Sequence, residues 1–138
     1  MNIDSITNGI VIDHISAGKG MKIYQLLELD KLSSSVALII NVNSTKMGKK
    51  DIIKIDCNLD INMDILGFVD PNVTVDVIRD GVLVEKKKIG LPETLTNIIY
   101  CKNPRCITAT EQEIKHVFKL TDKENKVYRC MYCESKAE

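Results

Sequence analysis

Four cysteines in two close pairs constrain this chain more than any other feature. Cys101 and Cys106 stand in the segment YCKNPRCI, and Cys130 and Cys133 stand in RCMYC. Two short-spaced pairs on two turns can bring four sulfurs to one point, which is the tetrahedral arrangement that Zn²⁺ accepts at about 2.3 Å. Four protein ligands close the metal's shell and leave no position for water, so the predicted zinc is structural.

Other interpretations of the cysteines are weaker. Iron in a rubredoxin-like site uses similar ligands, although such sites usually carry Cys-x2-Cys in both pairs. Separate buried thiols fit two tight pairs poorly. The start MNIDSITNG has no basic stretch followed by an apolar run, so we expect a cytoplasmic protein whose thiols stay reduced. Cys57 is then expected to be a buried free thiol.

The predicted zinc would stabilise a lobe that has little core of its own. Residues 98–138 follow the connector LPETLTN (91–97) and hold few apolar side chains. Chains of about 40 residues seldom fold on such a core, whereas metal binding can contribute about 10 kcal/mol to folding. Short strands are expected at IIYC, IKHVFKLTD and KVYRCMYC. The charge of the thiolates would be offset by the adjacent Lys102, Arg105 and Arg129.

Residues 1–97 have the alternation of a strand-rich domain with two helices. Strands are predicted at 9–15, 36–44 and 51–57, and in a hairpin over 73–89 that turns at Asp80-Gly81. Helices are predicted at 16–30 and 58–70. This is the order of a split βαβ sandwich with one added strand. We therefore predict an α+β fold, in which a ferredoxin-like β-α-β-β-α-β domain precedes a small antiparallel β zinc-ribbon-like domain.

Alternation also predicts which side chains face the core of the first domain. The expected core-facing sets are Val36, Leu38, Ile40 and Val42 on one strand and Ile53, Ile55 and Cys57 on the next. Lys54 points the other way, toward the sheet face that the core does not use. With His14 and Lys86 it could form a triphosphate pocket if their three strands are neighbours. For a single lysine, however, a solvated surface position is the default.

The composition and the missing motifs exclude several functions. Lys+Arg and Asp+Glu both number 19 and aromatics are 4%, which disfavours nucleic-acid binding. The longest apolar run, VALII (36–40), is far short of the roughly 20 residues that span a membrane. There is no HExxH, GxSxG or P-loop spacing. No acidic pair to hold Mg²⁺ is evident, so binding is favoured over catalysis. His116 is expected to be a surface residue, because four cysteines complete the shell.

With these residues in view, the chain resembles the regulatory chains of aspartate carbamoyltransferase nearly end to end. The resemblance rests on GIVIDHI, MGKKDIIKI, TVDVIRDG, LPE, CKNPRCI and CMYCE in this order. It implies a nucleotide-binding allosteric domain over 1–97 and a zinc domain over 98–138 that docks on the catalytic chain. It further implies a non-catalytic cytoplasmic subunit in pyrimidine biosynthesis that binds CTP, ATP and UTP.

The resemblance also implies roles for particular residues. Asp13 and His14 would contact the ribose and phosphate region of the nucleotide, Lys54 the ribose or base, and Lys86 the phosphates. Backbone groups from Asp4 to Ile6 would contact the base edge. Gly81 departs from the pattern, because some members carry an aromatic residue there.

Partner contacts follow from the same resemblance. Asn103 and Glu134 match family positions at the contact with the catalytic chain, and two regulatory chains would pair through their nucleotide domains as a homodimer. The strand VALIINV would suit such a pairing edge, although burial in the core explains it equally well. The alternative function is a zinc-ribbon nucleic-acid-binding protein, which the cysteines and lysines would allow and the neutral charge disfavours.

Overall fold

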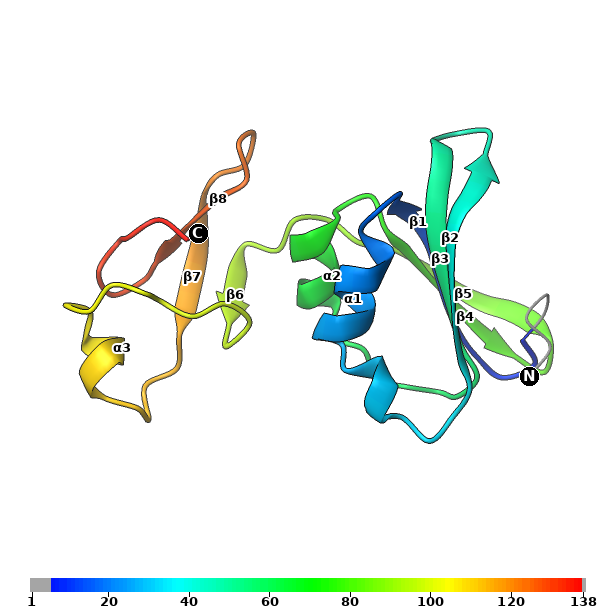
Figure 1. Cartoon of the computed structure of the whole chain (residues 1–138), viewed down its shortest axis with the longest axis horizontal. Helices are drawn as coiled ribbons and strands as arrows, with labels where there is room; N and C mark the ends of the chain where they lie inside the picture. The colour runs from blue at the N-terminus through cyan, green and yellow to red at the C-terminus, as the bar shows by residue number, and fades with distance from the viewer. Residues whose placement is uncertain (1–5, 138) are drawn as a thin grey trace. The chain divides into compact units, whose positions relative to one another are not determined.

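The chain forms two compact units, Met1–Gly90 and Leu91–Glu138, and the computed structural model describes residues 6–137 (Figure 1). The sequence predicted the boundary after residue 97, whereas the structure divides the chain after Gly90. The reason is that part of the predicted connector forms a strand, β6 (Thr94–Thr96), which pairs with the second unit. Each unit therefore has its own antiparallel sheet.

The first unit is a five-stranded antiparallel sheet in the order β2-β3-β1-β4-β5. Its strands are β1 (Gly9–Ser16), β2 (Val36–Ser44), β3 (Gly48–Ile55), β4 (Thr74–Arg79) and β5 (Val82–Lys88). The helices α1 (Gly20–Leu26) and α2 (Met63–Val69) cover one face of the sheet (Figure 1). The predicted β-α-β-β-α-β order, with one added strand, is confirmed.

The core lies between the sheet and the helices. Its buried side chains are aliphatic: Ile10, Ile12, Ile15, Ile23, Leu29, Ile53, Ile55, Ile61, Leu66, Val69, Val73 and Val75. Each such side chain stabilises the fold by roughly 1.5–3 kcal/mol relative to full exposure. Ile53 and Ile55 share the core face as predicted, and the free thiol of Cys57 packs half-buried against the same cluster.

The sequence predicted that Val36, Leu38, Ile40 and Val42 all face the core from β2. This prediction is wrong for the second half of the strand. Val36 and Leu38 pair with Ile55 and Ile53 and face the helices, but the register shifts between Ile39 and Val42. Asn41 adopts a left-handed φ of 60° in this bulge. A bulge inserts a residue and reverses the alternation that follows. Val42 therefore lies on the other face of the sheet, paired with Lys50.

A buried carboxylate, that of Asp51, holds the bulge. Asp51 is 1% exposed. Its Oδ1 accepts a hydrogen bond from the backbone N–H of Asn41 (3.1 Å), and its Oδ2 accepts from Gly18 (3.1 Å) and Gly20 (2.9 Å). A Cβ at position 20 would lie 2.8 Å from this Oδ2, which explains the glycine. One side chain thus joins β3, the bulge of β2 and the start of α1.

Local sequence signals set the ends of the helices and one turn. Asn62 caps α2 by accepting a hydrogen bond from the backbone N–H of Asp64 (3.0 Å). Asp80 and Gly81 have φ of 52° and 76°, as a two-residue type I′ hairpin requires. The first helix is shorter than predicted, because η1 (Leu29–Lys31), a 3₁₀ turn, replaces its last turn. Among the described residues no helix is long and apolar enough to cross a membrane.

The second unit is a three-stranded antiparallel sheet, β6-β7-β8. The helix α3 (Ile107–Thr110) precedes β7 (Val117–Asp122) and β8 (Val127–Cys130). The strand predicted at IIYC (98–101) is not formed, and these residues belong to a loop. The buried apolar or aromatic side chains of this unit, its cysteines apart, are Leu95, Phe118 and Tyr128. The small antiparallel second domain is confirmed, and its apolar core is as small as expected.

Replacing Asp51 with alanine tests the role of the buried carboxylate. Asp51→Ala leaves three backbone N–H groups without an acceptor, so we expect the first unit to lose roughly 3–5 kcal/mol of stability. Amide hydrogen exchange of β1 and β3 as a function of urea measures this loss. Asp30→Ala, at an exposed position, is the control. A loss below about 1 kcal/mol at position 51 would contradict the role assigned to it.

Candidate functional site

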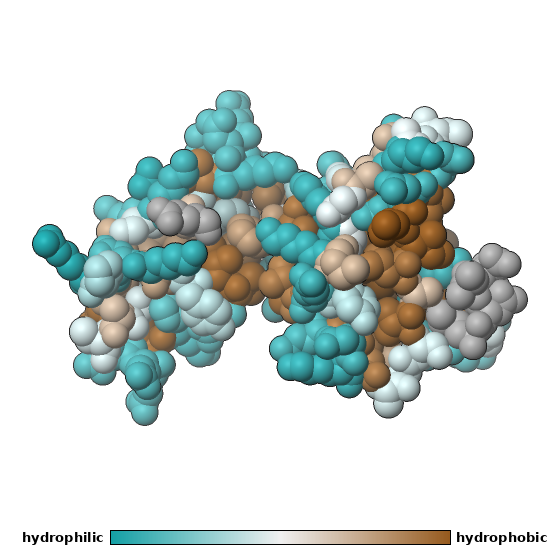
Figure 2. Space-filling view, in the orientation of Figure 1, coloured by the Kyte–Doolittle hydropathy of each residue, from teal (hydrophilic) through white to brown (hydrophobic). Residues whose placement is uncertain are grey.

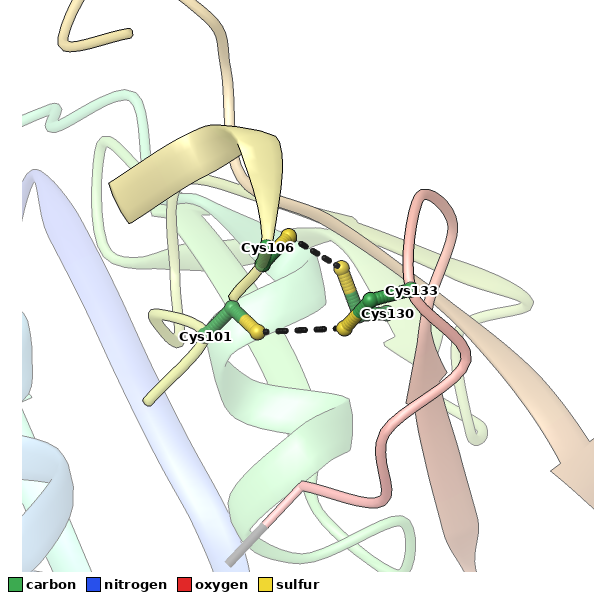
Figure 3. A group of neighbouring side chains, drawn as sticks. All are labelled: Cys101, Cys106, Cys130 and Cys133. Atoms are coloured by element: carbon green, nitrogen blue, oxygen red, sulfur yellow. Dashed lines mark hydrogen bonds between the residues drawn. The ribbon is translucent and has the colours of Figure 1, made fainter. Parts of the chain in front are cut away.

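The sulfurs of the four paired cysteines meet at one point in the second unit (Figure 3). All four Sγ atoms lie within 4.8 Å of one another, with 3.6 Å from Cys101 to Cys133 and 3.7 Å from Cys106 to Cys130. A tetrahedral ion with bonds of about 2.3 Å to sulfur requires sulfurs about 3.8 Å apart. A disulfide requires about 2.05 Å. The geometry therefore fits a tetrahedral metal and does not fit disulfides.

Two turns of the backbone present these sulfurs. In the first turn, the N–H of Cys106 donates to the carbonyl of Asn103 (3.1 Å), and α3 begins directly after this cysteine. In the second, the N–H of Glu134 donates to the carbonyl of Cys130 (2.9 Å), where β8 ends. In each turn, one ligand therefore lies at the end of a regular element, Cys106 as the N-cap of α3 and Cys130 as the last residue of β8, and the other lies in the adjoining loop.

Hydrogen-bond donors favour the thiolate form at two of the cysteines. The Thr108 hydroxyl donates to Cys106 Sγ (3.1 Å) and lowers the pKa of that thiol. Hydrogen bonds from Ser135 lower the pKa of Cys133 to about 6. Burial acts in the opposite direction at Cys101, whose pKa it raises to about 12. Four thiolates this close to one another require a cation, which a bound metal ion supplies.

His116 and Asn103 form hydrogen bonds that hold the two ligand-bearing turns in place. The Nδ1 of His116 accepts the backbone N–H of Cys101 (3.1 Å), and its ring meets Tyr100 edge to face with centroids 4.9 Å apart. The side chain of Asn103 donates to the Ser135 hydroxyl (3.1 Å), which links the two turns. The sequence predicted His116 only as a surface residue and gave no role to Ser135. Both act through contacts between segments that are distant in sequence.

Arg129, which the sequence predicted to offset the charge of the thiolates, has an exposed side chain. Tyr128 and Cys130 are buried on the inner side of β8, and Arg129 between them is exposed on the outer side. Its Nη1 donates to the carbonyl of Glu134 (3.1 Å). Glu134 itself has a left-handed φ of 64° and an exposed side chain.

In the first unit, the predicted polar residues lie on the sheet face that the helices leave uncovered. Cross-strand pairing aligns Lys54 of β3, Val11 of β1, Asp76 of β4 and Lys86 of β5 in one row. Directly paired residues project from the same face. Lys54 and Lys86 therefore share a face but are three strand spacings apart, roughly 14 Å. Of the three strands whose adjacency the predicted pocket required, β3 and β1 are neighbours, but β4 separates β5 from β1.

The neighbouring row of this face brings in the other predicted residues. Asp13 pairs with Thr74, and Thr74 pairs with Lys88. His14 lies in a bulge of β1 with φ of 58°, and its Nδ1 is 2.9 Å from the Thr74 hydroxyl. Lys50 Nζ forms an ion pair with Asp13 (3.0 Å). A hydrogen bond from the His14 N–H and the charge of Lys50 oppose the effect of burial and lower the pKa of Asp13.

Two small adjoining hollows, of about 280 and 200 Å³, lie beside His14. Both are lined by His14, Lys46 and Asn72, and the smaller one also by Thr74 and Lys88. Lys46 comes from the hairpin between β2 and β3, and Lys88 from the end of β5. An imidazole and two ammonium groups thus surround a recess large enough for part of a small anion-bearing ligand.

Asp76 also belongs to this face, and the sequence did not single it out. Its Oδ1 is buried and has no hydrogen-bond partner among the described residues. Burial raises the pKa of Asp76, and the nearby Lys86 partly offsets this effect. An aspartate in a strand gives no signal of its own. Only the pairing of Asp76 with Val11 and Lys86 shows that it lies between the two lysines.

The segment from Asp4 to Ile6, whose backbone was predicted to contact the base edge, lies only partly within the described residues. Asp4 lies outside the described residues, and Ile6 is 5% exposed. The following residue, Thr7, accepts the backbone N–H of Gly81 through its carbonyl (2.9 Å). This bond places the segment after Ile6 against the β4–β5 turn, at one end of the polar face.

Comparison with known proteins covers both units. Residues 1–90 match the family model described as "Aspartate carbamoyltransferase regulatory chain, allosteric domain", and residues 93–138 match that of its "metal binding domain". A protein of Clostridium botulinum (strain Hall) named aspartate carbamoyltransferase regulatory chain is 53% identical over 134 residues, 97% of this chain and 92% of its own length. One of the same name from Bifidobacterium longum is 47% identical over 138 residues, 100% and 99% of the two lengths. Another, from Clostridium tetani, is 50% identical over 135 residues, 97% and 94%.

Removing the metal tests the dependence of the second unit on its cysteine cluster. Because metal binding contributes about 10 kcal/mol to such small units, a chelator should abolish amide-exchange protection in β7 and β8. Protection in β1 and β3 should remain, and it serves as the internal control. Adding Zn²⁺ back should restore the second unit. Full protection of β8 in protein shown to be metal-free by mass spectrometry would contradict this expectation.

Proposed function

Because the chain belongs to the family of aspartate carbamoyltransferase regulatory chains, we propose that its first unit binds CTP, ATP and UTP and thereby controls a catalytic chain held by its second unit. The match extends over residues 1–90 and 93–138 and confirms the resemblance seen in the sequence. It also confirms the expectation of a non-catalytic chain of pyrimidine biosynthesis. The nucleotides, the metal and the contacts with partners are the proposal.

One observation carries the proposal of a nucleotide site. The sheet face without helices carries four basic side chains that the hydrophobic core does not require: Lys54, Lys86, Lys46 and His14. A triphosphate is a flexible polyanion that ammonium and imidazole donors bind through charge-assisted hydrogen bonds. In the proposed site, Lys86 and His14 contact the phosphates, and Lys54 reaches the ribose or base.

The remaining groups of this face suit the nucleoside. Asp13 would accept hydrogen bonds from ribose hydroxyls, and the backbone from Asp4 to Ile6 would contact the base edge. The base would lie near the β4–β5 turn, against which the segment after Ile6 packs. Gly81 in this turn has φ of 76° and no side chain to stack on the base. Backbone contacts would therefore distinguish the nucleotides.

The proposed regulation is a shift between quaternary states. A ligand changes an equilibrium only by its difference in affinity for the two states. Coupling of about 1–3 kcal/mol is typical and must be reciprocal between effector and substrate. The nucleotide would therefore bind one quaternary state of the assembly more tightly and take no part in the reaction.

In the second unit, the proposed metal is a structural Zn²⁺ held by Cys101, Cys106, Cys130 and Cys133. When bound, it would supply the charge that fixes the two turns, with no open position for chemistry. Exposed apolar side chains directly adjoin the four ligands: Tyr100 (59% exposed), Ile107 (48%), Met131 (45%) and Tyr132 (40%). Patches of this kind mark interaction sites. We assign them, with Asn103 and Glu134, to the contact with the catalytic chain.

The proposed homodimer uses the first unit. The strand β2 is an edge of the five-stranded sheet, and Ile40 on it is 58% exposed. An exposed edge with apolar side chains can pair with the same edge of a second copy.

The proposed location is the cytoplasm, where thiolate ligands remain reduced. No observation favours the nucleic-acid-binding alternative over this function.

Replacing Lys86 tests the nucleotide site. Lys86→Ala removes an ammonium group from the uncovered face, so the affinity for CTP and ATP should fall about tenfold, or 1.4 kcal/mol. The matched control is Lys87→Ala, because Lys87 pairs with the core residue Val75 and points the other way. Isothermal titration calorimetry of the purified chain measures both. Equal affinities for the Lys86 variant and the unmodified chain would remove Lys86 from the site.

The pH dependence of binding tests the position of Asp76. Because burial raises the pKa of Asp76, its charge is lost as the pH falls from neutral toward acid. An ionised Asp76 repels a triphosphate by about 1 kcal/mol, so Asp76→Asn should bind about fivefold more tightly at pH 7.5. The ratio of the two affinities should fall toward one as the pH is lowered and Asp76 becomes protonated. Asp64→Asn on α2 is the control. A ratio that does not change with pH would place Asp76 outside the site.

A further inference from the structure

A row of three cations crosses the outer face of the second sheet. Lys119 of β7 pairs directly with Arg129 of β8, and Arg129 pairs with Lys136 in the segment that follows the cysteines. All three are exposed, whereas their neighbours Phe118 and Tyr128 are buried on the inner side. Like charges directly opposite one another destabilise a sheet. These three residues, here called the cation row, therefore oppose folding of the unit that carries them.

Within the described part of the chain, no carboxylate neutralises the cation row through an ion pair. The ion pairs formed there involve other lysines: Lys31, Lys50 and Lys87. Arg129 donates one bond to the carbonyl of Glu134 and has further N–H groups to donate. Lys136 contributes slightly to the lowered pKa of Asp122, but that carboxylate is held mainly by hydrogen bonds from Asn125.

The face around the cation row is hollowed. Two recesses of about 530 and 520 Å³ share Lys119 and Thr121 in their linings. Arg129, Met131 and Glu134 also line the first, and Thr94 and Lys123 also line the second. A flexible ammonium group between two recesses can approach an acidic side chain that enters either of them. The shape thus suits a protein surface with projecting carboxylates.

We infer that the cation row binds an acidic segment of the catalytic chain, a contact that rests on the function proposed above. Strands lie about 4.8 Å apart, so the three cations span roughly 10 Å. Carboxylates three or four residues apart on a helix lie about 5–6 Å apart and match this spacing. The contact adds to the apolar patch beside the cysteines and makes assembly sensitive to salt.

Two observations favour an acidic protein segment over a nucleic acid. No aromatic side chain lines either recess, so bases would have nothing on which to stack. Glu134 lines one recess and Glu93 the other, and both would repel a continuous phosphate backbone. Carboxylates on a folded partner protein are separate groups at fixed positions. They can therefore contact the cation row without lying next to Glu134 or Glu93.

Charge reversal in the intact chain tests the cation row. Lys119→Glu/Arg129→Glu should weaken binding to the purified catalytic chain by at least tenfold, measured by interferometry at 50 mM salt. The neutral variant Lys119→Gln/Arg129→Gln should show a smaller loss and a flatter dependence on salt. Lys115→Glu, an exposed lysine of the same unit, is the control and should change affinity less than twofold. Metal content and amide exchange verify that each variant is folded.

The outcomes separate this contact from the proposed function. If the unmodified chain does not bind the catalytic chain, the proposed function fails and the contact fails with it. If the unmodified chain binds and the reversed variant binds equally well, the function stands and the cation row is not a contact. Binding of a 20-nucleotide single-stranded RNA that reversal abolishes, with binding to the catalytic chain unchanged, would assign the row to nucleic acid and overturn the inference.

Discussion

The second unit depends on four sulfurs held at the spacing of a tetrahedral metal site. Its apolar core is too small to order the two turns, and burial would keep thiols such as Cys101 protonated in the absence of a cation. A metal ion reverses both effects, because it binds the thiolates and joins the turns. The exposed aromatic and aliphatic side chains lie directly beside the ligands, so the same ion would shape the surface proposed to meet the catalytic chain.

The first unit divides its sheet between stability and binding. One face packs aliphatic side chains against two short helices, and Asp51 joins the bulge of β2 to the start of α1 from this side. The other face is left to Lys54, Asp76, Lys86 and His14, none of which the core requires. This division explains how a chain without catalytic groups can present a built polar surface, and it supports the proposed role as a nucleotide sensor.

Local features of the sequence predicted local structure well. Asp80-Gly81 predicted its hairpin because both residues tolerate positive φ, and the polar residues at the start of 58–70 predicted a capped helix, although α2 begins only at Met63, after its cap Asn62. The cysteine spacing predicted the sulfur cluster for the same kind of reason. Features that depend on distant partners were missed: the bulge at Asn41 needs Asp51, and β6 needs β7. The place of Asp76 and the support that His116 gives to Cys101 likewise required the strand order.

In the proposed regulation, nucleotide on the first unit and substrate on the catalytic chain bias one shared equilibrium. The most direct measurement is the affinity for CTP and ATP of the assembled complex, with and without a tight-binding substrate analogue on the catalytic chain. Reciprocal linkage predicts a change of about fivefold or more for at least one nucleotide, and no change for the isolated regulatory chain. Identical affinities in the complex, whatever the catalytic chain has bound, would contradict the claim.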